Sequence, residues 1–346
     1  MELSEVKKNI VKYDNILDLD KIISTYHKIM INTKHRSKIF EYNIFYCCNL
    51  ITILNKLSYR NYSHSEYNIF LIKEPKLRVI MSEKLEDKIV NHLVSDYLLL
   101  PLIEPKLIDS NVATRTGKGT KMAIYYMKKY LISIHKKHQN FYILKCDISK
   151  FFYNIDHEVL LNKLSKIGLD NDSYQIIKNI INSTNYQYIY DSINNLGVES
   201  NYKIGKGLGI GNQTSQILAI FYLNDLDHYI KEILHIKYYI RYMDDFILMH
   251  EDKEYLKKCL IKIKEFLKHD KLELNNKTSI ISIKNGITFI GYKYIFKKNR
   301  LYMLIPSNTK KRIKKRIRTK KTTIDNYNGY LIFGDTSKFK KSMEFI

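Results

Sequence analysis

One stretch decides the fold, and it reads YYIRYMDDFILM over residues 238–249. Two runs of strand-forming residues, 237–242 and 246–249, flank the adjacent carboxylates Asp244 and Asp245. This pattern predicts a β-hairpin whose turn presents both acids at the end of a sheet. Taken alone, a pair of aspartates is more often an ordinary polar turn than a functional site, so the interpretation depends on what else reaches this sheet end.

A third carboxylate, Asp147, ends another strand-forming run, FYILKCDI over residues 141–148. If the two strands are neighbours, Asp147 converges on Asp244 and Asp245. Three carboxylates around one point repel each other unless cations neutralise them, and hard divalent ions such as Mg²⁺ prefer oxygen ligands. Two such ions about 4 Å apart form the known clamp for in-line phosphoryl transfer. The pattern therefore indicates nucleotidyl-transfer chemistry.

Periodicity predicts an α+β fold in which helices back a small antiparallel sheet. A hairpin with a basic tip is expected from strands 68–72 and 77–81, and a further strand pair from 287–295 and 301–305. A tyrosine-rich connection is expected after residue 181, before a glycine cluster at 205–211. Helices are expected up to about residue 59 and over about 85–103, 118–137, 151–164, 173–181, 213–233 and 253–269.

The composition describes a folded basic protein. Of 346 residues, 58 are Lys or Arg and 35 are Asp or Glu, which gives a net charge of +23, while 45% are hydrophobic. No apolar run approaches the ~18 to 20 residues of a membrane span, and the first ten residues lack a secretory apolar region. The four cysteines include no C-x-x-C pair, which argues against a zinc cage or a disulfide framework. We expect a reduced, cytoplasmic protein without membrane contact.

The position of the charge is more informative than its total, because the abundance of Lys, Ile, Asn and Tyr is typical of AT-rich coding. Residues 274–324 contain fifteen Lys or Arg and no acid. Within this segment, Ile313 and Ile317 form an apolar stripe on the basic run 310–321. This run predicts a helix that packs by one face and lies along the phosphates of a nucleic-acid duplex.

Several motifs, in order, resemble those of reverse transcriptases. They are PKLRVI at 75–80, RTGKG at 115–119, DISKFF with Ile155, His157 and Leu160 from 147, LGIGNQTSQ at 208–216, YMDD at 242–245, FIGY at 289–292 and GYL at 329–331. The resemblance implies a right-hand polymerase fold with helical and hairpin fingers, a ferredoxin-like antiparallel palm and a short helical thumb. It places the fingers at 1–140 with part of 165–204, the palm at 141–164 and 205–296, and the thumb at 297–346.

The resemblance also implies a role for each matching residue. Asp147, Asp244 and Asp245 are the expected catalytic residues and, with the backbone carbonyl of Ile148, would bind two Mg²⁺ ions, with Mn²⁺ as a substitute. Phe151 falls where the family has an aromatic gate against the ribose 2′-hydroxyl, although a core Phe would also suit that position. The other expected nucleotide contacts are Lys76, Arg78, Ile210, Gly211, Gln216 and Lys277. The expected nucleic-acid contacts are Arg115, Lys118, Lys310, Lys311, Arg312, Lys314, Lys315, Arg316 and Arg318.

The second palm motif narrows the resemblance. Most reverse transcriptases have P-Q-G where this chain has Gly209-Ile210-Gly211, and here the motif ends in Ser215-Gln216. This combination is similar to the enzymes of diversity-generating retroelements, which copy a template RNA with errors at adenines. Such an enzyme would be bacterial or phage-encoded and would bind template RNA, an RNA/cDNA duplex, dNTPs and a small basic accessory protein. A defence-associated reverse transcriptase of the abortive-infection type and a maturase-like RNA-binding protein are the alternatives.

Other local matches are rejected. The glycines of 205–211 follow no clear strand and lack the downstream acid of a dinucleotide fold. The run 117–120 lacks the first glycine of a phosphate-binding Walker loop. His135 and His138 are interpreted as part of a solvated helix end rather than as metal ligands.

Overall fold

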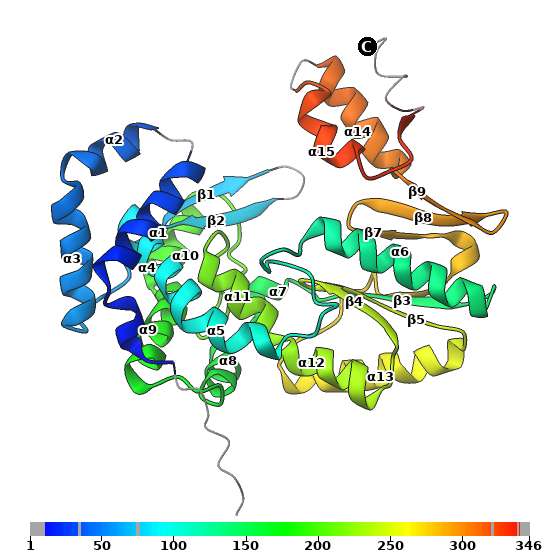
Figure 1. Ribbon diagram of the computed structural model, residues 1–346, viewed down its shortest axis with the longest axis horizontal. Coiled ribbons are helices and arrows are strands. Elements are labelled where there is room, and N and C mark those ends of the chain that lie inside the picture. The colour runs from blue at the N-terminus through cyan, green and yellow to red at the C-terminus, as the bar shows by residue number, and fades with distance from the viewer. Residues whose placement is uncertain (1–10, 34–35, 74–76, 320–321, 338, 340–346) are drawn as a thin grey trace, which may run out of the picture. The chain divides into compact units, whose positions relative to one another are not determined.

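A computed structural model of the chain describes residues 11–33, 36–73, 77–319, 322–337 and 339 (Figure 1). The described residues belong to two compact units, each assembled from separate segments of the chain. The first unit contains Met1–Ile108, Ser149–Asp225 and Leu267–Leu272, and the second contains Asp109–Ile148, Leu226–Phe266 and Glu273–Ile346. Across the described segments, no helix is both long and apolar enough to cross a membrane.

The first unit consists mainly of helices around a two-stranded antiparallel hairpin. Its strands are β1 (Asn68–Ile72) and β2 (Arg78–Ser82), with Phe70 opposite Ile80. The helices are α1 (Leu19–Asn32), α2 (Arg36–Ile44), α3 (Tyr46–Ser58), α4 (Leu85–Val94), α5 (Leu100–Ile103), α7 (Phe151–Asn154), α8 (His157–Leu164), α9 (Asn171–Asn182), α10 (Gln187–Asn195) and α11 (Gln213–Tyr222). The predicted hairpin is therefore confirmed, and its expected tip at residues 74–76 lies outside the described residues.

One face of the hairpin packs against α10. The buried side chains Val79 and Met81 of β2 join Ile189 and Ile193 of α10 and Tyr202 in one apolar cluster. The sequence predicts a tyrosine-rich connection after residue 181, and over residues 187–195, which form α10, that prediction is wrong. The apolar side chains Ile189 and Ile193 lie one helical turn apart, and burying them against β2 stabilises a helix there.

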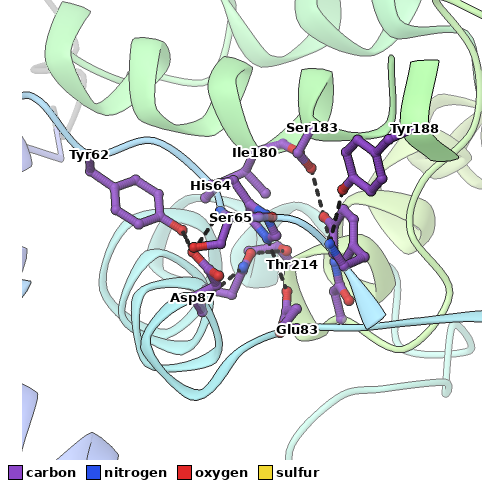
Figure 2. Close-up of polar contacts among 12 residues, drawn as sticks. Tyr62, His64, Ser65, Glu83, Asp87, Ile180, Ser183, Tyr188 and Thr214 are labelled. Atoms are coloured by element: carbon purple, nitrogen blue, oxygen red, sulfur yellow. Dashed lines mark hydrogen bonds and ion pairs between the residues drawn. The ribbon is translucent and has the colours of Figure 1, made fainter. Parts of the chain in front are cut away.

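A buried polar network surrounds the base of this hairpin, as Figure 2 shows. The Tyr62 hydroxyl donates to Asp87 Oδ1 at 2.8 Å, and the Ser65 backbone N–H donates to the same oxygen at 3.2 Å. Nearby, Thr214 Oγ1 donates to Asn91 Oδ1 at 2.6 Å, which connects α11 to α4. Buried polar groups in a low-dielectric interior favour a single arrangement when they are paired, so this network fixes the segments that flank β1 and β2.

The second unit contains a four-stranded antiparallel sheet in the order β4-β5-β3-β6. The strands are β3 (Tyr142–Asp147), β4 (Tyr238–Tyr242), β5 (Asp245–His250) and β6 (Ser279–Ser282). A second, three-stranded sheet has the order β7-β8-β9, formed by β7 (Ile287–Phe289), β8 (Tyr292–Lys297) and β9 (Arg300–Leu304). The helices of this unit are α6 (Thr120–Lys137), α12 (Asn224–His228) and α13 (Lys253–His269). The first residues of α12 and the last residues of α13 are assigned to the first unit.

Alternation of side chains gives the four-stranded sheet two buried faces. Ile143, Ile240 and Ile247 belong to the cluster that also contains Met127 and Leu131 of α6. Figure 1 shows α13 on the side of the sheet opposite α6. Both faces of the sheet are thus covered, and the acidic turn lies at one of its ends.

The C-terminal part of the second unit has its own small core. Helix α14 (Ser307–Arg318) follows β9, and α15 (Asn328–Leu331) follows after a short connection. Ile313 of α14 is 1% exposed and packs with Ile305, Leu331 and Phe339. The predicted helix over 310–321 is therefore present with its apolar face inward, and residues 320–321 lie outside the described part of the chain.

Two helices and one strand that the sequence predicts as continuous are interrupted in the structure. The helix over 151–164 breaks before Asp156, whose carboxylate accepts the Val159 N–H at 3.2 Å and so begins α8. The helix over 213–233 is broken at Leu223. The strand over 287–295 is divided by a turn in which Ile290 and Gly291 have φ values of 45° and 81°. Local caps and positive φ override the apolar periodicity at these points.

Candidate active site

The three predicted acids lie at one end of the four-stranded sheet. Asp147, the last residue of β3, is the direct Cα partner of Asp245, the first residue of β5. The N–H of Ile148 donates to the backbone carbonyl of Asp244 at 3.3 Å. The two strands are thus neighbours, as predicted, and their pairing brings the backbone of all three aspartates together.

The environment of Asp245 raises its pKa to about 6, mainly because burial disfavours the charged carboxylate. The negative charges of Asp147 and Asp244 act in the same direction, while the ammonium group of Lys145 opposes them. Asp245 Oδ1 is buried and has no hydrogen-bond partner. A bound cation would stabilise the ionised form of this carboxylate.

The donor set fits a hard divalent cation, because carboxylates and the nearby backbone carbonyl of Ile148 supply only oxygen ligands. The buried, unpartnered Oδ1 of Asp245 is an atom that such a cation could satisfy. No three His, Cys, Asp or Glu side chains of the described residues already surround one point as metal ligands. Asp147, Asp244, Asp245 and Ile148 remain the predicted metal ligands.

The turn between β4 and β5 has an unusual backbone conformation that Arg241 supports. Met243 has φ of 57°, a left-handed value that costs a residue with a side chain about 1 kcal/mol or more. Arg241, with a fully buried side chain, donates from Nη1 to the Met243 carbonyl at 3.0 Å. This hydrogen bond fixes the residue immediately before Asp244.

Arg241 is itself held by a buried carboxylate. Its Nε donates to Asp227 Oδ1 at 2.7 Å and its Nη2 to Asp227 Oδ2 at 2.6 Å, and both side chains are 0% exposed. The Tyr239 hydroxyl donates to Oδ1 at 2.6 Å, and Asn111 Nδ2 donates to Oδ2 at 3.3 Å. Both carboxylate oxygens are thereby satisfied, and the network extends from α12 to the acidic turn.

Sequence reasoning missed Arg241 and Asp227. The available signal was a charged residue inside an otherwise apolar strand, because a fully buried arginine requires a paired acid. Lys145, inside the run FYILKCDI, gives the same signal. Neither signal identifies the partner, which depends on how distant segments pack.

The structure places Lys277 in a turn attached to β3. The backbone N–H of Asn275 donates to the Asp147 carbonyl at 2.7 Å, and the Lys277 N–H donates to Asn275 Oδ1 at 3.0 Å. Lys277 is exposed. Its predicted contact with a nucleotide stays a prediction.

Two expected nucleic-acid contacts have internal partners. Arg115 is 9% exposed, and its Nη1 donates to the Asn111 carbonyl at 2.9 Å. Lys118 Nζ donates to the Asp109 carbonyl at 3.0 Å and lies 3.3 Å from its Oδ1. These contacts support the loop before α6, and the predicted contacts with nucleic acid remain untested.

The predicted nucleotide-binding residues Arg78, Ile210 and Gly211 lie on β2 and on the loop beside it in the first unit. The N–H of Met81 in β2 donates to the Ile210 carbonyl at 3.1 Å, which places the second palm motif beside the strand that begins with exposed Arg78. Gly211 has φ of 131°, and a Cβ there would lie 3.1 Å from the Met81 carbonyl oxygen. Only glycine suits this approach of loop to strand.

The other predicted nucleotide contacts differ in exposure. Phe151 is 2% exposed and makes edge contacts with Phe152 and Tyr222, at centroid distances of 5.8 and 6.5 Å. Gln216 is exposed on α11. Lys76 lies outside the described residues. The gate role of Phe151 stays a prediction, and its burial is equally that of a core residue.

The basic residues of α14 lie around its single buried side chain, Ile313. Lys310 and Lys314 place their ammonium groups 5.7 and 5.8 Å from the centre of the Phe339 ring. The exposed positions are Lys311, Arg312, Lys315 and Arg318, while Arg316 is half-buried. The predicted phosphate-contacting helix therefore presents a basic outer surface.

Two predicted motifs contact each other at the base of this C-terminal part. The Tyr292 hydroxyl donates to the Tyr330 carbonyl at 2.7 Å, and the two rings stack with centroids 4.7 Å apart. The Tyr330 hydroxyl donates to the Gly291 carbonyl. Motifs FIGY and GYL are separated in sequence but form one structural unit.

The backbone of three aspartates meets at one end of an antiparallel sheet, which is the arrangement expected for the palm of a nucleotide-polymerising enzyme. Comparison with family models agrees: residues 72–294 match the family "Reverse transcriptase (RNA-dependent DNA polymerase)". The chain therefore belongs to the reverse transcriptase family. The match includes all three aspartates, and the predicted α+β right-hand polymerase fold is confirmed at the level of the family.

The fold comparison finds telomerases among the solved structures. Apo telomerase from Candida tropicalis, truncated from its C-terminal domain, has a TM-score of 0.49 at 18% identity and aligns over 74% of this chain. Candida albicans telomerase in complex with a fragment of telomeric RNA has a TM-score of 0.49 at 12% identity and aligns over 72%. The chain covers 60% and 46% of those two proteins. No curated protein matches the chain.

Proposed function

We propose that this protein is an RNA-directed DNA polymerase that copies a template RNA into cDNA. The observation that carries the proposal is the pairing of β3 with β5, which sets Asp147 opposite Asp245 and beside the backbone of Asp244, in a chain of the reverse transcriptase family. The substrates would be dNTPs and a primer annealed to RNA.

The reaction follows from the chemistry of the site. The 3′-hydroxyl of the primer releases its proton to solvent and its oxygen forms a bond to the α-phosphorus of the dNTP. The bond from that phosphorus to the oxygen that bridges the α- and β-phosphates breaks, and pyrophosphate leaves. Asp147, Asp244, Asp245 and the Ile148 carbonyl would hold Mg²⁺, or Mn²⁺ in its place. Divalent cations so bound stabilise the charge that develops on the attacking and leaving oxygens. Arg78 would bind the triphosphate through its guanidinium fork.

Primer extension tests this function directly. With Mg²⁺, dNTPs and a DNA primer annealed to an RNA template, the purified protein is expected to add nucleotides complementary to the template. Omission of Mg²⁺ should stop the reaction, and addition of Mn²⁺ should restore it. Failure to extend on any primed RNA, with or without the cognate structured RNA and an accessory protein, would contradict the proposal.

The more specific proposal is a diversity-generating enzyme with errors at template adenines. It is supported by Ile210, an aliphatic side chain where most family members have glutamine. Polar contacts discriminate between substrates far better than apolar ones, so the absence of an amide at this position removes a constraint on the nascent base pair. The half-buried Ile210 is attached to β2 through its carbonyl, and β2 begins with Arg78.

Ile210→Gln is expected to lower misincorporation opposite template adenine by roughly tenfold, the discrimination of about one hydrogen bond. Sequencing of the cDNA products measures the error spectrum. Ile204→Gln, at a 74% exposed isoleucine in the preceding loop, is the matched control and should leave the spectrum unchanged. An Ile210→Gln spectrum identical to that of the wild type would refute this role for Ile210.

The remaining expectations concern partners and context. A small basic accessory protein and a structured template RNA would assist the enzyme in the bacterial or phage-infected cytoplasm. A template repeat and a variable repeat in the flanking DNA would support diversification. Their absence would favour the defence-associated alternative.

A further inference from the structure

Lys145 contacts the acidic turn at Asp245 and the three-stranded sheet at Thr288. It lies two residues before Asp147 on β3, so the two side chains leave the same face of the strand. Its Nζ is 3.3 Å from Asp245 Oδ2 and donates to the Thr288 carbonyl of β7 at 2.9 Å. The ammonium group therefore contacts the carboxylate of Asp245 while its side chain stays partly exposed.

Core packing does not account for a lysine at this position. The strand neighbours Leu144 and Cys146 are 0% exposed, whereas the side chain of Lys145 is 27% exposed. The ammonium group of Lys145 also contacts two acceptor oxygens, the Thr288 carbonyl and the carboxylate of Asp245. Asp245 is a predicted metal ligand. A residue needed only to fill the sheet face would not need a positive charge.

The two carboxylate oxygens of Asp245 have different surroundings. Oδ2 interacts with Lys145, while Oδ1 is buried and has no hydrogen-bond partner. One oxygen is thus used to orient the carboxylate, and the other remains for a cation. At the same time, the positive charge of Lys145 opposes the binding of a second positive charge nearby.

We propose that Lys145 is a positioning residue that orients Asp245 through Oδ2 and weakens the binding of divalent cations to the palm when no nucleotide is present. This inference rests on the proposed function. The triphosphate of an incoming nucleotide brings negative charge that offsets the charge of Lys145. Tight metal binding is thereby coupled to the arrival of the substrate.

The test measures binding of Mn²⁺ to the full chain without nucleic acid or nucleotide, from the electron paramagnetic resonance signal of free Mn²⁺. Lys145→Gln is expected to bind Mn²⁺ about tenfold more tightly than the wild type, the size of effect that one charge within ~4–6 Å has on a neighbouring ionisation. Lys145→Arg keeps the charge and should bind like the wild type. Lys293→Gln, on β8 opposite Thr288, removes a charge outside the contact and should also leave Mn²⁺ binding unchanged.

Two results would be decisive against the inference. Unchanged or weaker Mn²⁺ binding by Lys145→Gln would overturn it, as would equally tight binding by Lys145→Arg. If the Gln variant does not fold, judged by its melting curve, Lys145→Met keeps the aliphatic stem and gives the same reading. If Asp147→Asn binds Mn²⁺ as tightly as the wild type does, the metal assignment of the proposed function is refuted instead.

Discussion

Asp244→Asn is expected to lower the rate of nucleotide incorporation by at least about a thousandfold, with little change in stability. The substitution keeps the shape of the turn but removes one of the three negative charges that are proposed to hold the cations. The backbone carbonyl of Asp244, which accepts the Ile148 N–H, is unaffected. Primer extension on RNA measures the rate, and a melting curve checks that the fold is retained.

The matched control is Glu265→Gln, which neutralises an exposed carboxylate on α13 that is not among the predicted metal ligands. It should extend primers like the wild type. If Asp244→Asn retained more than a tenth of the wild-type rate, the two-metal assignment of the palm would be wrong.

Asp227→Asn is expected to reduce the free energy of unfolding by roughly 3–5 kcal/mol, the cost of leaving a buried charge without its partner. Arg241 then remains fully buried without a negative charge beside it. We expect the same variant to lose polymerase activity, because Arg241 also holds the Met243 carbonyl before the acidic turn. Denaturant unfolding and primer extension measure the two effects.

A double variant separates stability from positioning. Replacing both partners, with Arg241→Met and Asp227→Leu, removes the unpaired charge and should recover much of the stability. It should not recover activity, because no donor then binds the Met243 carbonyl. A double variant as active as the wild type would show that the network only stabilises the fold.

The part of the site that the sequence predicts correctly depends on local patterns. The acidic hairpin was predicted because strand-forming residues flank Asp244 and Asp245, and the observed strands end within one or two residues of the expected positions. Asp147 was predicted because its own strand ends on the acid. In both cases, the evidence lies within a few residues of the chain.

The part that was missed depends on distant contacts. Arg241 and Asp227 are 14 residues apart on different elements, and nothing in their local sequences indicates the pair. The short strand β6 is another feature that the sequence did not predict. Its four residues are half-buried or exposed. Their pairing with β3 accounts for the strand. Tertiary packing therefore decides these features, as it decides the helix at residues 187–195.

The small core beneath α14 has a thermodynamic consequence. Only four of the described residues are buried in it, and Tyr330 packs against both this core and the larger one around the sheets. Because this core buries so little apolar surface, we expect the segment to open at a lower free energy than the sheets of the second unit. A nucleic acid that binds only the closed form stabilises it by mass action. If α14 binds a duplex as predicted, opening of this segment and binding of the duplex are linked equilibria. The affinity for the duplex could then change through this segment while the three aspartates stay the same.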